Sequence, residues 1–318
     1  MAEFEKFHFS SLNELKDKMK ELGISIPVSE DLSPLAEHVK IGEKDAPNSL
    51  AVLPMEGCDG EKNGSPSALT VRRYKRFAGG GAGLIWCEAC AVTAEGRANP
   101  RQLFLHSGNV DEFKKLTEIC IREAKEKNGT RPILILQLTH SGRYARPFDN
   151  NAPMVAQHDP ILDPKVGITE TYPIVTDEYL DELQEKYVQS ALLAKEAGFD
   201  GVDIKACHRY LVSELLASHT RTGKYGGDFK NRSRFLLEVI KKVREEAGRN
   251  FIIASRFNVF DAHPYPYGFG VSKKQEWVPD LTEPLLLVEQ MIEAKIDLLS
   301  NSAGNPYYRF PQVTRPFD

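Results

Sequence analysis

The sequence lacks the long apolar runs and the one-sided charge that mark several protein classes. No hydrophobic run approaches the roughly 20 residues of a membrane-spanning helix, and the charged N-terminus contains no signal-peptide core. The 41 Lys and Arg residues nearly balance the 45 Asp and Glu residues, giving a net charge of −4. This balance argues against a dedicated nucleic-acid or anionic-membrane binder. We therefore expect a cytoplasmic protein with neither kind of partner.

Cysteine is also sparse, with five residues in 318. Cys87 and Cys90 form a C-x-x-C, but no second such pair exists to complete a zinc site. Their context, GLIWCEACAV, is typical of a buried strand, in which residues three apart point to opposite faces. We expect two buried, inert thiols and no metal site.

A dinucleotide-binding motif is absent as well. A G-x-G-x-x-G would have to follow the first strand, but that strand is followed by PMEGCDGEKNG. The glycine cluster AGGGAG (78–83) precedes a strand, so it is interpreted as a turn at a helix end.

What the sequence does contain is a repeated alternation of apolar runs and helical stripes. Helices are predicted after Asn109, after Thr176, across Phe235 to Val243 and across Leu285 to Ala294. The apolar runs are 49–54, 83–89, 132–138, 201–206, 251–257 and 296–302. Strands that are apolar on both faces and alternate with helices predict a parallel α/β sheet. Without the dinucleotide motif, a (β/α)8 barrel is favoured over an open doubly wound sheet.

Polar side chains gather where the predicted strands end, which is where barrels carry their chemistry. In chain order, the residues at these strand ends, polar and apolar together, are Pro54, Met55, Glu56, Glu88, Ala89, Gln137, His140, Arg143, Lys205, His208, Tyr210 and Arg256. Residues 144–175 form a long loop over the same face, and loops of this length are usually functional. Residues 1–40 lie outside the repeat as an N-terminal extension, whose amphipathic helix at 11–23 is predicted to cover the barrel's bottom. The barrel itself is assigned to residues 41–318.

The strand-end residues resemble those of the old yellow enzyme family, the NADH:flavin oxidoreductases and ene reductases. The matching segments are LAVLPMEG, GLIWCEACAVTAEGR, QLTHSGR, GFDGVDIKACHRYLVSELLASHTRTGKYGGDFKNRSRFLLEVI and FIIASRF. The resemblance extends from about residue 36 to residue 304. It implies an α/β TIM barrel that binds FMN at its mouth, takes hydride from NADH or NADPH and reduces an unsaturated small molecule.

The resemblance also implies roles for individual residues. Pro54, Met55, Glu56 and Ala89 would line the flavin, and Gln137 would pair with its pyrimidine edge, because a primary amide offers both a donor and an acceptor. Arg256 would stabilise the charge of the reduced flavin. Tyr210 would be the proton donor, with Lys205 and His208 holding the substrate oxygen.

Two of these residues depart from the family pattern. Lys205 stands where many relatives have a histidine, and Glu56 stands where relatives often have Thr or Cys. The lysine would contact substrate or flavin, or it would pair with Glu56 or Glu88. A carboxylate near the flavin disfavours the reduced anion unless it is paired, which makes Lys205 its expected partner.

The number of strands is a third departure. Six strand ends can be counted before RFPQVTRPFD, whereas the family barrel has eight strands and holds the FMN phosphate on the loops after the last two. We therefore expect a chain truncated after about six strands, as part of a longer protein, rather than a native six-stranded enzyme.

The sequence leaves other functions open. A lysine at a strand end near a tyrosine would also suit a Schiff-base lyase with Lys205 as nucleophile. A non-catalytic remnant is the other alternative. The oligomeric state, including a homo-oligomer, is not decided by the sequence.

Overall fold

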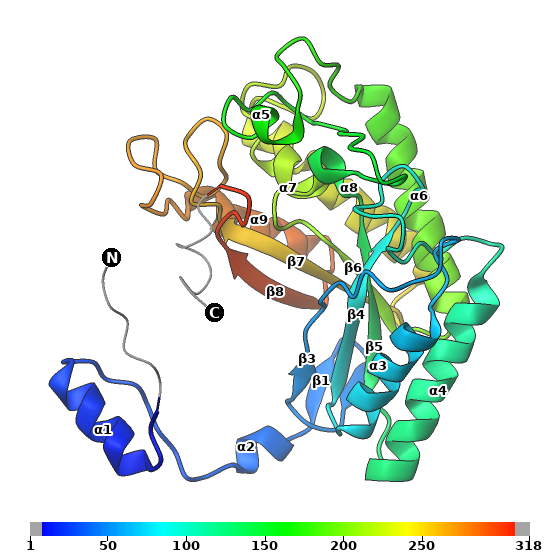
Figure 1. Cartoon of the computed structure of the whole chain (residues 1–318), viewed down its shortest axis with the longest axis vertical. Coiled ribbons are helices and arrows are strands. Elements are labelled where there is room, and N and C mark those ends of the chain that lie inside the picture. The colour runs from blue at the N-terminus through cyan, green and yellow to red at the C-terminus, as the bar shows by residue number, and fades with distance from the viewer. Residues whose placement is uncertain (1–7, 309–318) are drawn as a thin grey trace.

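Six parallel strands form one curved sheet, in the order in which they occur in the chain (Figure 1). The computed structural model describes residues 8–308. The strands are β3 (Ala51–Val52), β4 (Leu84–Ala91), β5 (Ile133–Thr139), β6 (Gly201–Ile204), β7 (Ile252–Phe260) and β8 (Leu298–Ala303). Each lies within or overlaps one predicted apolar run. The fold prediction is confirmed: helices alternate with the strands of a half-barrel of the (β/α)8 type.

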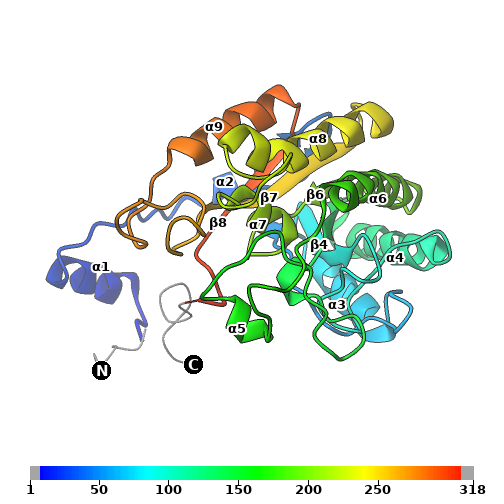
Figure 2. The same cartoon turned by 90° about the horizontal axis from the view of Figure 1, so that it is seen from above.

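The long helices cover the convex outer face of this sheet (Figure 2). They are α3 (Ala68–Gly79), α4 (Val110–Asn128), α6 (Asp177–Glu196), α8 (Phe229–Ala247) and α9 (Thr282–Glu293). Several begin at side chains that accept hydrogen bonds from the free N–H groups of the first turn: Ser67 in α3, Thr176 in α6 and Asp228 in α8. Within the described residues, no helix is long and apolar enough to cross a membrane.

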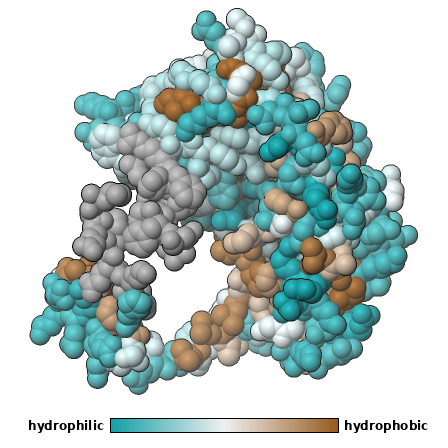
Figure 3. Space-filling model, viewed as in Figure 1, coloured by the Kyte–Doolittle hydropathy of each residue, from teal (hydrophilic) through white to brown (hydrophobic). Residues whose placement is uncertain are grey.

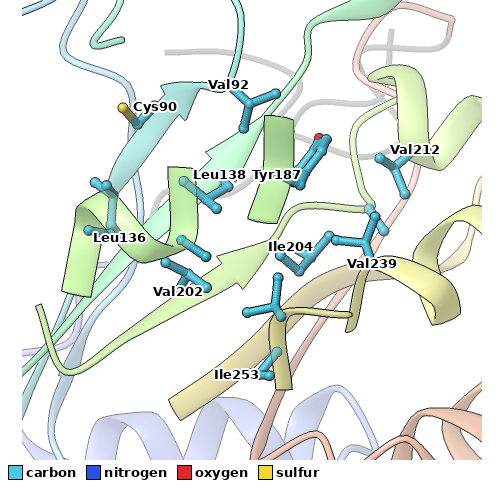
Figure 4. Packing of buried hydrophobic residues seen from close by; sticks show 14 of the residues in the cluster. Cys90, Val92, Leu136, Leu138, Tyr187, Val202, Ile204, Val212, Val239 and Ile253 are labelled. Carbon is cyan, nitrogen blue, oxygen red and sulfur yellow. The ribbon is translucent and has the colours of Figure 1, made fainter. Parts of the chain in front are cut away.

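The outer core forms between the sheet and these helices. Leu136 and Leu138 of β5, with Val202 and Ile204 of β6, pack beneath α6 and α8 (Figure 4). Tyr187 is a fully buried contributor from α6. This packing explains why the strands are apolar on the helix-facing side.

The inner face of the sheet is apolar only near its base. Leu84, Trp86, Ile133, Ile135, Ile252 and Ala254 form a second cluster there. A hairpin of β1 (Val39–Ile41) and β2 (Lys44–Ala46) adds Ile41 and Ala46 to this cluster. The hairpin therefore covers the bottom of the half-barrel.

The predicted role of the N-terminal helix as the bottom lid is wrong. Helix α1 (Leu12–Glu21) forms as expected, with Ser11 as its N-cap, but it buries no residue. It projects from the body, joined to it through α2 (Ser33–Ala36), and Figure 3 shows apolar atoms along this connection. The β1–β2 hairpin occupies the position predicted for the helix. Its residues Ile41 and Ala46 pack into the inner apolar cluster, whereas no residue of α1 is buried. Residues 1–7 of the predicted extension and 309–318 of the predicted barrel lie outside the described residues.

An irregularity in β4 corrects the interpretation of the C-x-x-C. The register between β4 and β5 shifts between Cys87 and Ala89. Because the bulge adds one residue, Cys87 and Cys90 both belong to the outer core instead of pointing to opposite faces. Both thiols are free and buried, and burial raises the pKa of Cys87 and of Cys90 above the usual range.

Short elements and loops lie beyond the carboxyl ends of the strands. They include a 3-10 turn (Gly142–Tyr144), α5 (Asp163–Val166) and α7 (Leu211–Leu216). Arg143 is fully buried among them and pairs with Glu214 and with Asp163. These ion pairs fix the long 144–175 loop against α7.

Candidate active site

Three inward-facing residues lie at one level where the half-barrel opens. Strand pairing aligns Ala89 of β4 with Gln137 of β5, and Gln137 with Asp203 of β6. All three are buried. Lys205 follows Asp203 by two residues, so it continues the same face toward the mouth. The β4 bulge brings Ala89 into this row, because without the extra residue the position beside Gln137 would be Glu88.

Asp203 is the centre of the hydrogen bonds at this level. Its Oδ2 accepts from Trp86 Nε1 at 2.9 Å and from Gln137 Nε2 at 2.6 Å, and its Oδ1 accepts from the backbone N–H of Arg256 at 2.8 Å. Burial raises the pKa of Asp203 to about 6, although these donors act in the opposite direction.

Arg256 extends from β7 toward the end of β3. Its Nη1 donates to the carbonyl of Pro54 at 3.2 Å, while its Nε is buried with no partner among the described residues. An unpaired buried donor is costly, so this guanidinium has capacity for a further acceptor. Beside it, Met55 is 81% exposed, which leaves an apolar side chain open at the mouth.

Lys205 and Tyr210 reach the same oxygen atom. The Lys205 Nζ lies 3.3 Å from Glu56 Oε1, and the Tyr210 hydroxyl donates to that oxygen at 3.2 Å. The Lys205 ammonium also lies 4.0 Å from the centre of the Tyr210 ring. Burial raises the pKa of Tyr210 well above its usual range, and the charge of Glu56 adds to the effect.

His208 lies between these two residues in the sequence, in a left-handed backbone conformation. His208 has φ 60° and Arg209 has φ 58°, both uncommon for residues other than glycine. Burial lowers the pKa of His208 to about 3, with a contribution from the nearby Lys205 and Arg256. The imidazole is therefore neutral near pH 7.

Some predicted mouth residues lie elsewhere. Glu88 is not a partner of Lys205, because its carboxylate faces α3 and pairs with Arg73. It also accepts from the Gly57 N–H at 2.7 Å, which anchors the loop that carries Glu56. His140 bonds Tyr179 at 2.9 Å and thus belongs to the packing of the loop.

Sequence reasoning missed three residues around the mouth. Asp203 is one, although a charged residue in the apolar run GVDIKA was a usable signal. Tyr307 is the second: it stacks on Tyr144 with ring centres 3.6 Å apart and hydrogen-bonds Tyr210. Arg209 is the third, fully buried between Asp159 and Asp261, at 3.5 and 3.2 Å. The last two contacts join segments distant in the chain, so no local pattern announced them.

The mouth combines two donors that meet at one oxygen with polar and apolar side chains from the neighbouring strand ends. Lys205 and Tyr210 supply a cation and a hydroxyl to one oxygen. Gln137 and Arg256 supply an amide and a guanidinium next to an exposed methionine. Residues 8–308 contain no group of three or more His, Cys, Asp or Glu side chains arranged for a metal ion.

Comparison with known proteins relates the chain to flavoenzymes. The model of the NADH:flavin oxidoreductase / NADH oxidase family matches residues 34–305. An NADPH dehydrogenase of Halalkalibacterium halodurans is 31% identical over 248 residues, covering 77% of this chain and 65% of the relative. An NADH oxidase of Thermoanaerobacter brockii is 30% identical over 281 residues, covering 87% of this chain and 40% of the relative. The chain therefore spans between two fifths and two thirds of these relatives' lengths.

Solved structures give the same fold. An Old Yellow Enzyme from Pichia superposes with a TM-score of 0.71 at 20% identity, covering 84% of this chain and 70% of that one. A 2-naphthoyl-CoA reductase complex superposes with a TM-score of 0.70 at 21% identity, covering 86% of this chain and 41% of that one.

Proposed function

The chain belongs to the NADH:flavin oxidoreductase / NADH oxidase family, and from this premise we propose that it reduces the C=C bond of an α,β-unsaturated carbonyl compound with FMN and NADH or NADPH. The names of the relatives support an NAD(P)H-dependent flavin oxidoreductase. The choice of a C=C bond as the acceptor rests on the chemistry at the end of β6.

The residues present fit an FMN ring. The Nε of Arg256 in β7 is a buried donor with no acceptor among the described residues, and the Gln137 amide offers donor and acceptor functions from β5, on the other side of β6. Pro54, Met55 and Ala89 supply apolar contacts at the same mouth. The chemistry that FMN supplies when bound is the acceptance of hydride from a nicotinamide and its transfer to an acceptor.

The observation that carries the proposal is the convergence of two donors on one oxygen. Lys205 Nζ and the Tyr210 hydroxyl both reach Glu56 Oε1, at 3.3 and 3.2 Å. We infer that the oxygen of a carbonyl acceptor replaces this carboxylate oxygen. The Lys205 cation at that position stabilises the negative charge that develops on the carbonyl oxygen during reduction, and the Tyr210 hydroxyl lies beside the bound acceptor.

Tyr210 is the proton donor in this proposal. Its phenol is protonated at neutral pH, because burial raises an already high pKa. When the O–H bond breaks and the proton moves to the α-carbon, the electron pair remains on the phenol oxygen. The ammonium of Lys205, 4.0 Å from the ring centre, then offsets the new charge. The neutral His208 completes the group as a second hydrogen-bonding contact for the acceptor oxygen.

Anaerobic turnover with cyclohexenone tests this function. The purified chain is incubated with FMN, NADH or NADPH and cyclohexenone, and both the oxidised nicotinamide and the cyclohexanone are quantified. The proposal predicts one cyclohexanone for each nicotinamide oxidised. Nicotinamide oxidation without a saturated product would leave an oxidoreductase with a different acceptor.

The same preparation distinguishes the two alternatives. A Schiff-base lyase would be trapped by borohydride as a covalent adduct on Lys205, but an ion-paired ammonium has no free electron pair with which to attack a carbonyl. A non-catalytic remnant would neither bind FMN nor oxidise nicotinamide.

A further inference from the structure

The carboxylate of Asp203 connects four strands beneath the mouth. It extends from β6 and accepts hydrogen bonds from Trp86 of β4, from Gln137 of β5 and from the backbone of Arg256 of β7. The residue is fully buried. Three N–H groups compensate its charge through direct hydrogen bonds, and the nearby Lys205 ammonium adds a favourable interaction through space.

The contact with Gln137 determines which way that amide faces. An ionised carboxylate can only accept, so the group at 2.6 Å from Asp203 must be the Nε2 amide nitrogen. The opposite end, Oε1, accepts no hydrogen bond among residues 8–308, although the residue is only 2% exposed. The Gln137 oxygen and second N–H therefore stay available for an amide-like ring edge, which needs both an acceptor and a donor.

The contact of Asp203 with Arg256 similarly fixes a residue of β7. The N–H of Arg256 is bonded to Asp203 Oδ1, which holds the backbone from which the guanidinium extends. One buried carboxylate therefore determines the placement of both polar residues assigned to the cofactor.

We propose that Asp203 is a positioning residue of the flavin site, which orients the Gln137 amide and anchors Arg256 without itself touching the cofactor or substrate. The assignment rests on the proposed function only in taking Gln137 and Arg256 as cofactor contacts. Burying a carboxylate is costly even when N–H groups compensate it, and its hydrogen bonds to Gln137 and to the Arg256 backbone connect the buried charge to the site. The pKa raised to about 6 is the expected mark of that cost.

A double-mutant cycle in FMN affinity tests the proposal. Asp203→Asn keeps the side-chain shape but replaces a carboxylate, which can only accept, with an amide that can also donate, so the Gln137 amide is no longer held in one orientation. We expect the FMN dissociation constant to rise about tenfold, which is about 1.4 kcal/mol. Gln137→Ala should give a similar loss. Because both substitutions remove the same contact, the fold-loss of FMN affinity in the double variant should be much smaller than the product of the two single fold-losses. The assignment would be overturned if the two fold-losses of FMN affinity multiplied in the double variant. It would also be overturned if Asp203→Asn left FMN affinity unchanged.

Asp200→Asn serves as the control for a merely structural role. Asp200 is a buried carboxylate at the start of β6, held by Arg131 and by the Leu134 N–H, and it lies at the opposite end of the strand from the mouth. Its replacement should lower the melting temperature while leaving FMN affinity unchanged. If both aspartate variants weakened FMN binding in proportion to their loss of stability, Asp203 would be structural only.

A second measurement remains decisive if the chain binds no FMN. The side-chain amide signals of Gln137, identified by their loss in Gln137→Ala, are followed by nuclear magnetic resonance in the cofactor-free protein. One Nε2 proton should be protected from solvent exchange in the wild type and exposed in Asp203→Asn. Absence of FMN binding with protection intact would reject the proposed function but retain the orienting contact. Equal exchange in both proteins would reject the contact itself.

Discussion

Lys205 and Glu56 form an ion pair across the mouth of the half-barrel, with 3.3 Å between Nζ and Oε1. The lysine directly follows β6 and the glutamate follows β3, so the pair joins the ends of two distant strands. The side chain of Lys205 is 5% exposed and that of Glu56 is 19% exposed. The glutamate is therefore the partner that an incoming anionic oxygen displaces more readily.

This pair predicts opposite effects for its two members on anion binding. Glu56→Gln removes the competing charge, so a phenolate should bind several-fold more tightly. Lys205→Met removes the cation, so the phenolate should bind about tenfold more weakly, corresponding to about 1.4 kcal/mol. Calorimetric titration of both variants checks the signs. Weaker phenolate binding in Glu56→Gln would mean that Glu56 positions Lys205 and does not compete with the ligand.

Tyr210→Phe should separate the two halves of turnover. Loss of the phenolic proton should slow acceptor reduction by about a hundredfold or more, while the rate at which NADH or NADPH is oxidised in the first half-reaction stays unchanged. Rapid-mixing kinetics measure the halves separately. Tyr144→Phe is the matched control, because the Tyr144 ring lies 6.3 Å from that of Tyr210 and its buried hydroxyl has no partner among the described residues. Equal slowing of both halves in Tyr210→Phe would remove the proton-donor assignment.

Arg256→Ala should lower the reduction potential of bound FMN. A fixed cation favours the more negative reduced state, and its loss should cost on the order of 30 mV, or about 1.4 kcal/mol for a two-electron couple. Arg249→Ala, at an exposed position before β7, is the control. Spectroelectrochemical titration measures both variants, and an unchanged potential in Arg256→Ala would place the guanidinium away from the reacting ring.

His140 should make the fold sensitive to mild acid. Burial lowers the pKa of His140 to about 4, below the usual value of about 6.5. Because the unfolded chain binds the proton more readily, this contribution to stability is complete above pH 6.5 and is lost as the pH falls toward 4. By pH 5 the loss is about 2 kcal/mol. His208 and His219 act in the same direction, while Asp203, with its raised pKa, opposes them between about pH 4 and 6.

Denaturant unfolding at pH 7 and pH 5 measures this sensitivity. The difference in unfolding free energy between the two pH values should be smaller in His140→Gln than in the wild type. His38→Gln, at an exposed position, should keep the wild-type difference. An unchanged difference in His140→Gln would show that this histidine is not neutral and buried in the folded protein.

Much of the fold could be predicted from the sequence, because its signals are local. All six strands overlap their apolar runs, and the stripes of α4, α6 and α8 face the core as expected. The hairpin that covers the base escaped prediction because its strands are only three residues long. The β4 bulge escaped too, since one extra residue leaves no mark in an apolar run.

The candidate site was only partly predictable for the same reason. Lys205, His208 and Tyr210 are neighbours in the sequence, so their grouping at the end of β6 needed no tertiary information. The orientation of Gln137 and the packing of Tyr307 depend on contacts between distant strands and loops. Lys205 pairs with Glu56 and not with Glu88 because the bulge in β4 turns Glu88 toward α3, where it pairs with Arg73. The apolar run itself does not reveal this bulge.

FMN binding coupled to nicotinamide oxidation is the decisive test of a flavin-dependent function. The purified chain is titrated with FMN, and the complex is then mixed anaerobically with NADH and with NADPH while the flavin absorbance is followed. We expect one FMN to bind per chain and at least one nicotinamide to bleach the flavin, and we expect both effects to be weaker in Arg256→Ala. A chain that binds no FMN, or whose bound FMN is reduced by neither nicotinamide, would contradict it.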